Sequence, residues 1–270
     1  MILGIDAGGS AVKLACLDNG RVCFSRYIAN RSGNVAEQAA RALREAGIRP
    51  AAAAMTGVGA AVFETERLGL DCPVRRVLEI EAMAAGTRQL TGLEEFLTVS
   101  VGTGTAFVLR KNGQLRHIGG SAFGGGTLTG LCEKILGDKN TYQTLSRLCP
   151  QGDLARVDLL MSELPSCPPT LDPKMTAANL AKTGPDTTDA DWAIGILNLV
   201  MQTIGSMAYL AAGGHGVDNI VFTGGPTGIA QAKDIIAPFN QAYGIHFLIP
   251  DYSECATAVG AACLCTDDKM

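Results

Sequence analysis

The first residues of the chain carry the side chains best suited to hold a phosphate and a metal ion. One apolar run ends at Asp6 and the next contains Lys13; the turn between them holds Gly8, Gly9 and Ser10. Glycines let backbone N–H groups approach an anion, a hydroxyl adds a hydrogen bond, and a carboxylate can bind magnesium or its water. The pattern indicates a phosphate-binding hairpin with Asp6 as metal ligand, and an ordinary hairpin turn is the alternative.

A second hairpin is predicted at residues 97–109: a strand, a turn that contains Gly102 and Gly104, and another strand. Each hairpin is followed by an Asn-Gly turn, at residues 19–20 and 112–113. A recurrence about ninety residues apart indicates a duplicated lobe. Two facing glycine hairpins are what a cleft that grips a nucleotide tail requires.

Two further glycine-rich segments follow strand-like runs. Residues 119–127 precede apolar residues with helical spacing, and a glycine run that opens a helix places free N–H groups and the positive end of the helix dipole together. This favours contact with an anionic ligand over a loop that only needs positive φ. Gly224 and Gly225 end a strand-like run, a common place for adenine and ribose in open α/β sheets, although a lone glycine pair is more often a turn.

The order of predicted elements is that of a ribonuclease-H-like lobe, repeated once. The N-terminal lobe is expected to span residues 1–95, and the C-terminal lobe residues 96–270. The C-terminal lobe includes a helical insertion at about 138–188, broken by prolines, and a closing helix rich in alanine. A long, almost wholly apolar helix is expected at 189–212, in a core or an oligomer interface.

Composition restricts the classes of partner. With 270 residues and 47% hydrophobic residues the chain can bury a substantial core, and its net charge of −4 argues against nucleic acid and anionic membrane surfaces. No apolar stretch of membrane-spanning length and no signal peptide is expected, which predicts a cytoplasmic protein without a membrane. The nine cysteines include no C-x-x-C pair and are expected to be reduced thiols.

The ordered set of glycine motifs resembles the superfamily of actin, the sugar kinases and the heat-shock ATPases and, more narrowly, the type II pantothenate kinases. The resemblance runs in family order across nearly the whole chain. The Gly-Gly-Gly-Thr and Thr-Ala-Ala-Asn segments are its more family-specific parts. The segments that carry it are 4–13, 56–57, 78–82, 100–104, 124–131, 176–179, 221–225 and 258–261.

The resemblance implies an α/β kinase of two ribonuclease-H-like, actin-like ATPase lobes with the nucleotide in the cleft between them. Such a kinase closes on ATP and Mg2+ and transfers the γ-phosphoryl group to the primary hydroxyl of pantothenate, the first step towards coenzyme A. Asp6 would organise the metal, and Glu79 matches the general base of the family. From the residues alone, Glu81 is a rival candidate for this role, and a pair of surface carboxylates is the alternative interpretation of Glu79.

Further roles carry over from the family motifs. Ser100 and Thr103 match a hydroxyl pair near the acceptor, with Arg116 and His117 as further substrate-binding candidates. The residues expected to bind phosphate and nucleotide are Gly8, Gly9, Ser10, Lys13, Gly102, Gly104, Gly124, Gly125, Gly126, Thr127, Gly224 and Gly225.

Two departures from the family pattern concern the acceptor. His117 stands where the family commonly has an arginine, which suits the carboxylate of pantothenate because a guanidinium binds it through two hydrogen bonds. Arg116 is one residue earlier. Because adjacent strand residues point to opposite faces, Arg116 cannot replace the family arginine unless the strand slips or bulges. Cys255 and Ala256 replace bulky aromatics, which predicts a roomier pocket. An acceptor without the carboxylate, such as pantetheine, is therefore a second candidate.

Two rival classes share the superfamily. A partner-activating ATPase, like the dehydratase activators, would hold an iron–sulfur cluster with cysteines in a glycine-rich loop between the lobes, and no convincing cysteine pair lies there. A sugar or N-acetylhexosamine kinase often carries a His/Cys metal cluster, which the dispersed His117, His215 and His246 do not supply. The kinase is expected to form a homodimer through the 189–212 helix or the proline-rich segment before it.

Overall fold

The first hairpin belongs to a five-stranded sheet whose spatial order is β3-β2-β1-β4-β5. We describe the fold from a computed structural model, in which residues 1–30, 34–169 and 171–265 are described. The strands β1, β2 and β3 are antiparallel, and β4 and β5 continue the sheet parallel to β1. The bounds are β1 (Ile2–Ala7), β2 (Ala11–Asp18), β3 (Arg21–Ala29), β4 (Ala52–Thr56) and β5 (Val74–Arg76).

The second hairpin begins another five-stranded sheet with the same topology. Its order, β8-β7-β6-β11-β12, repeats that of the first sheet strand for strand, with the first three antiparallel and the last two parallel to β6. The predicted duplication and the two-lobe α/β class are confirmed. The bounds are β6 (Phe96–Val101), β7 (Thr105–Lys111), β8 (Gln114–Ser121), β11 (Asn219–Thr223) and β12 (His246–Leu248).

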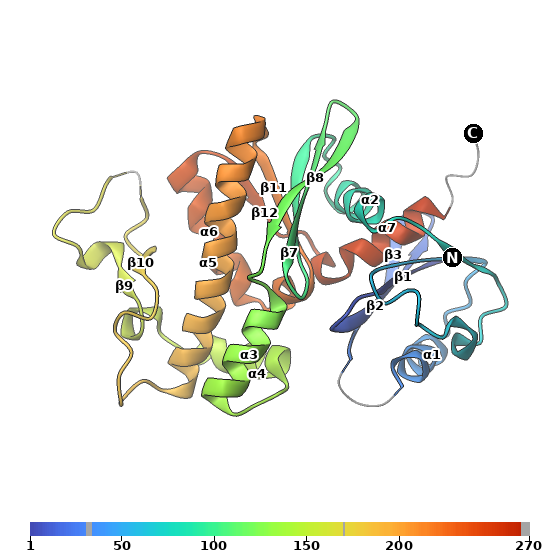
Figure 1. Cartoon of the computed structure of the whole chain (residues 1–270), viewed down its shortest axis with the longest axis horizontal. Helices are drawn as coiled ribbons and strands as arrows, with labels where there is room; N and C mark the ends of the chain where they lie inside the picture. The colour runs from blue at the N-terminus through green and yellow to red at the C-terminus, as the bar shows by residue number, and fades with distance from the viewer. Residues whose placement is uncertain (31–33, 170, 266–270) are drawn as a thin grey trace.

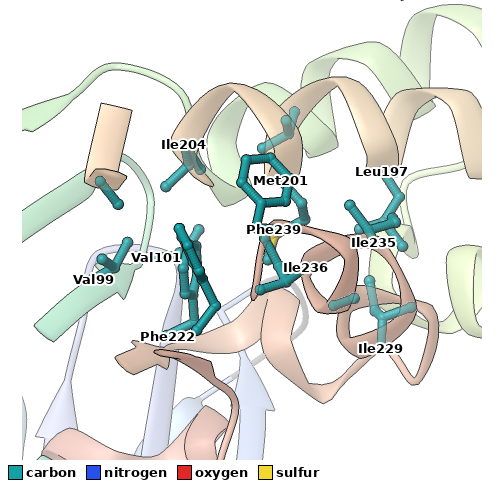
Figure 2. Packing of buried hydrophobic residues seen from close by; sticks show 14 of the residues in the cluster. Val99, Val101, Leu197, Met201, Ile204, Phe222, Ile229, Ile235, Ile236 and Phe239 are labelled. Atoms are coloured by element: carbon teal, nitrogen blue, oxygen red, sulfur yellow. The ribbon is translucent and has the colours of Figure 1, made fainter. Parts of the chain in front are cut away.

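Helices cover the outer face of each sheet (Figure 1). On the first sheet this is α1 (Val35–Glu45), followed later by the short 3-10 helix η1 (Thr65–Leu68). In the larger core of the second lobe, Val99 and Phe222 of the sheet lie beneath Met201 and Phe239 of two crossing helices (Figure 2). The helices of this lobe are α3 (Gly125–Leu136), α4 (Thr141–Leu148), α5 (Asp189–His215) and α6 (Gln231–Tyr243).

Helix α5 corrects the expectation that no apolar stretch is long enough to span a membrane. It is the one helix in the described ranges that is long and apolar enough by length and composition. In its most apolar window 61% of the residues are buried inside the protein; the helix packs against α6, and its Gln202 Nε2 donates to the Thr176 carbonyl of β10. That is the pattern of a core helix, because the apolar surface already has protein neighbours.

Two helices lie between the sheets, α2 (Glu79–Thr91) and α7 (Ala256–Leu264) (Figure 1). Helix α2 packs on the second sheet, where Met83 contacts the core around Phe96, and α7 packs on the first sheet, where Val259 contacts Leu17. The C-terminal helix, expected with the second lobe, thus lies against the first. The chain crosses between the lobes twice, and the division at residues 95 and 96 stays a prediction.

The two helices touch through their backbones. A Cβ atom added at Gly86 of α2 would overlap the carbonyl oxygen of Ala256, and one added at Gly260 of α7 would overlap that of Ala82. Gly4 of β1 has the same relation to the carbonyl of Ala258 in α7. Only residues without a side chain permit these approaches, so the small residues of α7 determine where it packs.

Of residues 138–188, expected to be helical, the described ones (138–169 and 171–188) are α-helical only in α4. Beyond it lie the 3-10 helices η2 (Cys149–Gln151), η3 (Leu154–Arg156) and η4 (Met161–Glu163) and the ribbon of β9 (Leu159–Leu160) and β10 (Thr176–Ala178). The fully buried Asp158 joins this segment to α5: it accepts hydrogen bonds from the Asn198 Nδ2 (2.7 Å), the Thr176 Oγ1 (2.8 Å) and the Leu180 backbone N–H (2.7 Å). Prolines in the segment, including Pro168 and Pro173, are incompatible with longer helices.

Substitution Gly86→Ala tests the contact between α2 and α7. A methyl group there must displace a backbone carbonyl, so we expect a loss of about 1–3 kcal/mol of stability and a melting temperature lower by several degrees. Gly130→Ala in α3 is the matched control, because a Cβ there meets no atom within 4 Å and alanine favours a helix. Equal melting temperatures for the two variants would contradict the role given to Gly86.

Candidate active site

A cavity of about 780 Å³ lies between the two glycine hairpins. Its walls come from both lobes: the β1–β2 and β6–β7 turns, the starts of α2, α3 and α4, and η5 (Gly225–Gly228) after β11. Most of the predicted site residues line it. These are Asp6, Gly8, Gly9, Ser10, Lys13, Glu79, Ser100, Gly102, Thr103, Gly104, Gly125, Gly126, Gly224 and Gly225.

Four predicted residues do not line this cavity. Gly124 is the N-cap of α3, and its backbone N–H donates to the Thr127 hydroxyl at 3.3 Å, so this pair shapes the turn. Arg116 and His117 are exposed on β8, the edge strand of the second sheet. The strand bulges at Ile118, since Phe107 pairs with Gly119 and Val108 with His117, but the bulge brings neither residue into the cavity. A substrate role for Arg116 and His117 stays a prediction.

A charged triplet lies on one wall. Asp6 and Lys13 are register partners on β1 and β2, with the Lys13 Nζ 3.1 Å from the Asp6 Oδ2. Glu79, the first residue of α2, is half-buried beside them. Burial raises the pKa of Glu79, the negative charge of Asp6 raises it further, and Lys13 lowers it. A carboxyl group with a raised pKa in a cleft is a typical general base.

The structure separates the two glutamates that the sequence left as rivals. Glu81 is exposed on the other side of α2, where it lines a second cavity that does not include Asp6. Glu79 alone of the two faces Asp6 and Lys13. The helical spacing explains this, because positions two residues apart on a helix point in different directions.

Helix N-termini converge on the cavity. Helix α2 begins at Glu79, α3 at Gly125, and Thr257 in the first turn of α7 lines the same space. Each contributes the positive end of a helix dipole, although in α3 the first two N–H groups, of Gly125 and Gly126, already donate to the carbonyls of Gly102 and Thr103. With Lys13 they favour a polyanion such as a triphosphate.

The two hairpins touch across the cleft. The hydroxyls of Ser10 and Thr103 are 2.7 Å apart, although 93 residues separate them in sequence. The Asn30 Nδ2 supports the first turn by donating to the Gly9 carbonyl at 3.1 Å. Sequence reasoning missed Asn30, and it missed Tyr27 and Tyr142, which also line the cavity. None of the three belongs to a glycine motif, so no pattern marked them.

Comparison with known proteins identifies the family of the chain. A family model described as Fumble matches residues 89–231. The chain is 31% identical over 234 residues to a type II pantothenate kinase of Oceanobacillus iheyensis, a match covering 83% of each chain. It is 26% identical over 234 residues to that of Staphylococcus saprophyticus, covering 83% of this chain and 84% of the relative. The chain belongs to the type II pantothenate kinase family. The resemblance in the glycine motifs is confirmed.

Solved structures place this type II pantothenate kinase family member in the actin-like fold. The (R)-2-hydroxyglutaryl-CoA dehydratase component A of Acidaminococcus fermentans matches 98% of this chain and 96% of its own, with a TM-score of 0.64 and 18% identity. A ROK family glucokinase from Streptomyces griseus, in complex with glucose and AMPPNP, matches 98% of each chain with a TM-score of 0.55 and 17% identity. At such identities the likeness concerns the fold alone.

The residues around Asp6 fit a magnesium ion. The Asp6 carboxylate lines the cavity, and Thr56, its register partner on β4, has a buried Oγ1 without a hydrogen-bond partner in the described part of the chain. No cluster of three or more His, Cys, Asp or Glu side chains gathers within that part. Magnesium is commonly held by one or two carboxylates together with substrate phosphates and water, which is what Asp6 offers.

Substitution Glu79→Gln is expected to change stability in a pH-dependent way. Since folding raises the pKa of Glu79, its contribution to stability is fully present below the unfolded pKa, about 4.3, and is lost as pH rises through the folded pKa. A neutral glutamine does not titrate, so the melting temperature of Glu79→Gln should rise relative to the parent protein between pH 4 and pH 7.5. Glu81→Gln, at an exposed position, is the control. If the melting temperature of Glu79→Gln differed from that of the parent protein by the same amount at both pH values, the burial argument would be contradicted.

Proposed function

We propose that this protein is an ATP-dependent kinase that phosphorylates the primary hydroxyl of pantothenate. The observation that carries the proposal is the position of Glu79, a half-buried carboxyl group with a raised pKa facing Asp6 and Lys13 between two glycine hairpins. Relatives named type II pantothenate kinase support the reaction and the substrate. An actin-like neighbour in complex with AMPPNP supports the use of ATP in this fold.

In the proposed reaction the acceptor hydroxyl lies beside Glu79. The Glu79 carboxylate accepts the hydroxyl proton as the hydroxyl oxygen forms its bond to the γ-phosphorus. The bond between the γ-phosphorus and the bridging oxygen breaks, and that oxygen leaves with ADP. Burial and the neighbouring Asp6 raise the pKa of Glu79, which makes the carboxylate a stronger base for this proton.

The other residues position and neutralise the phosphates. Lys13 supplies a fixed positive charge, and the turns containing Gly8, Gly9, Gly102 and Gly104 present backbone N–H groups. Asp6 would hold a magnesium ion, whose positive charge would neutralise phosphate charge. Groups already held in place by the fold stabilise the developing charge without reorganisation during the reaction.

A second acceptor, pantetheine or a similar hydroxyl compound without a carboxylate, is favoured by one observation. Within the described ranges no arginine lines the cavity, and Arg116 lies exposed on β8. Lys13, the cavity-lining lysine, is already paired with Asp6. The cavity therefore has little positive charge left for an acceptor carboxylate.

Turnover assays with Glu79→Gln test the reaction and its substrate together. We expect magnesium-dependent ADP release with pantothenate and a decrease of at least about 100-fold in kcat for Glu79→Gln, since a general base contributes 10²–10⁴-fold. Glu81→Gln should retain parent activity. Turnover with pantetheine but not with pantothenate would support the proposed mechanism and identify pantetheine as the acceptor. ADP release independent of any acceptor would favour the partner-activating ATPase. A protein that releases no ADP with any acceptor would refute the kinase.

We also propose a homodimer formed through α5. Although most of this helix is buried, Leu210 is 72% exposed, and Trp192, Leu199 and Thr203 share its less buried side. Large exposed apolar side chains on one helix face are typical of interfaces between subunits.

Leu210→Glu tests the proposed interface. A charged side chain that must be desolvated on association should convert a dimer to a monomer in sedimentation or light-scattering measurements, while the melting of the isolated subunit stays similar. Val62→Glu is the control, because Val62 is 84% exposed on the first lobe, far from α5 in the sequence and fold. A parent protein that is monomeric at micromolar concentration would refute the dimer.

A further inference from the structure

Glu254 is a carboxylate of the cavity wall that the proposed reaction does not use. It is the middle residue of η6 (Ser253–Cys255), the 3-10 helix that leads into α7, and its partly buried side chain lines the cavity. Among the described lining residues the carboxylates are Asp6, Glu79 and Glu254, and Lys13 is the one with a positive charge. Lys13 is paired with Asp6 and also faces Glu79, whereas no described residue forms a hydrogen bond or ion pair with Glu254. The Glu254 carboxylate is therefore free to accept hydrogen bonds from a ligand.

The two neighbours of Glu254 hold this turn in place. Ser253 is 2% exposed; its carbonyl accepts the Gly224 backbone N–H at 2.9 Å, and its hydroxyl lies 2.7 Å from the Thr227 Oγ1. Cys255 is 1% exposed and packs in a cluster with residues of α7 and of β2 in the first lobe. The backbone of Glu254 is thus fixed on both sides before a ligand binds, which lowers the entropy lost on binding.

The stem of Glu254 lies beside the glycine turn after β11. A Cβ atom added at Gly228 would lie 3.5 Å from the Glu254 Cβ and 3.7 Å from its Cγ. Gly228 is the last residue of η5, and Gly224 and Gly225 at the start of the same turn line the cavity. The sequence predicts adenine and ribose at this glycine pair. The free carboxylate therefore lies beside the place predicted for the nucleoside.

A carboxylate suits one part of a nucleotide. An ionised carboxylate only accepts hydrogen bonds, and it repels the phosphates. Adenine presents an amino group next to ring nitrogens that accept, a pattern that the amide of Asn or Gln matches better. The 2′ and 3′ hydroxyls of ribose are two adjacent donors, which match the two oxygens of one carboxylate. Acidic side chains bind ribose hydroxyls in this way in dinucleotide-binding folds.

We propose that Glu254 binds the ribose of the nucleotide, its carboxylate accepting hydrogen bonds from the 2′ and 3′ hydroxyls. The inference rests on the proposed use of ATP and adds the residue that recognises the sugar. A nucleotide bound in the reverse direction would bring its phosphates towards Glu254, where two negative charges repel each other. The same side chain therefore also favours the orientation that places the phosphates at the glycine hairpins.

Calorimetry with two nucleotides in the presence of magnesium tests the contact with ribose. We expect the parent protein to bind ADP at least about 10-fold more tightly than 2′,3′-dideoxy-ADP, because hydrogen bonds to a charged group are lost. Glu254→Ala should bind the two nucleotides within about threefold of each other. Glu254→Gln keeps the size of the side chain and should also reduce the preference for ADP, which tests the proposal even where the alanine variant folds poorly.

A probe without ribose separates the sugar contact from a general loss of binding. Inorganic tripolyphosphate should bind Glu254→Ala at least as tightly as the parent protein, because a negative charge has been removed from the cavity. ADP should bind the same variant about 10-fold more weakly. Asp251→Ala is the matched control, because Asp251 lies three residues earlier, is exposed, pairs with Lys233 and does not line the cavity. This variant should keep the parent preference for ADP over 2′,3′-dideoxy-ADP.

The outcomes distinguish this inference from the proposed function. Equal affinity of the parent protein for ADP and 2′,3′-dideoxy-ADP would refute the ribose contact, and so would an unchanged preference in Glu254→Ala. Inosine diphosphate lacks the amino group of adenine. If Glu254→Ala lost only the preference for ADP over inosine diphosphate, the carboxylate would bind the base and the ribose assignment would be wrong.

Two further results concern the reaction itself. A parent protein that binds neither ADP nor ATP would refute the ribose contact together with the use of ATP. A ribose preference that depends on Glu254, in a protein without turnover of pantothenate, would support the contact and refute only the proposed acceptor.

Discussion

The site depends on the close contact between α2 and α7. Because Gly86 and Gly260 carry no side chains, the helix backbones touch, and each helix packs on the sheet of a different lobe. The same contact fixes where the helices begin: Glu79 starts α2, and Thr257 lies in the first turn of α7, both at the cavity. The geometry that joins the lobes therefore also places Glu79, the proposed general base, and two positive helix ends beside the two glycine hairpins.

The arrangement of charge follows from the antiparallel pairing of the first hairpin. Register pairing places Lys13 opposite Asp6, so these opposite charges lie 3.1 Å apart in a poorly solvated wall. Glu79 approaches this pair from α2, and its raised pKa reflects burial and the Asp6 charge that Lys13 only partly offsets. Two carboxylates near one lysine leave a site that gains stability when a cation or a proton enters, which is consistent with the proposed metal-dependent phosphoryl transfer.

Local sequence patterns predicted the parts of the site that local structure determines. Glycines before a hydroxyl or a helix indicated the hairpins and the start of α3, and strand order followed from the repeat of the two hairpins. The resemblance to type II pantothenate kinases selected Glu79 from two equivalent glutamates. Contacts between distant segments left no such pattern. The packing of α7 on the first lobe depends on Gly4 meeting Ala258, and the meeting of Tyr27 with Tyr142 depends on how the lobes face each other. The bulge at Ile118 likewise depends on pairing with β7, not on the β8 sequence alone.

Under the proposed function, the acceptor also meets apolar surface in the cavity. The 78% exposed Val58 lines the cavity beside the first glycine turn, and Met83, one helical turn after Glu79 on α2, lines it as well. Such side chains provide surface for an apolar part of the acceptor, which gains free energy when it is covered. An acceptor carboxylate finds no arginine among the described lining residues. Under the proposed function, the acceptor would therefore be selected more by the shape and apolar surface of the cavity than by its charge, and His117 in place of the expected arginine would be compatible with Glu79 as the base.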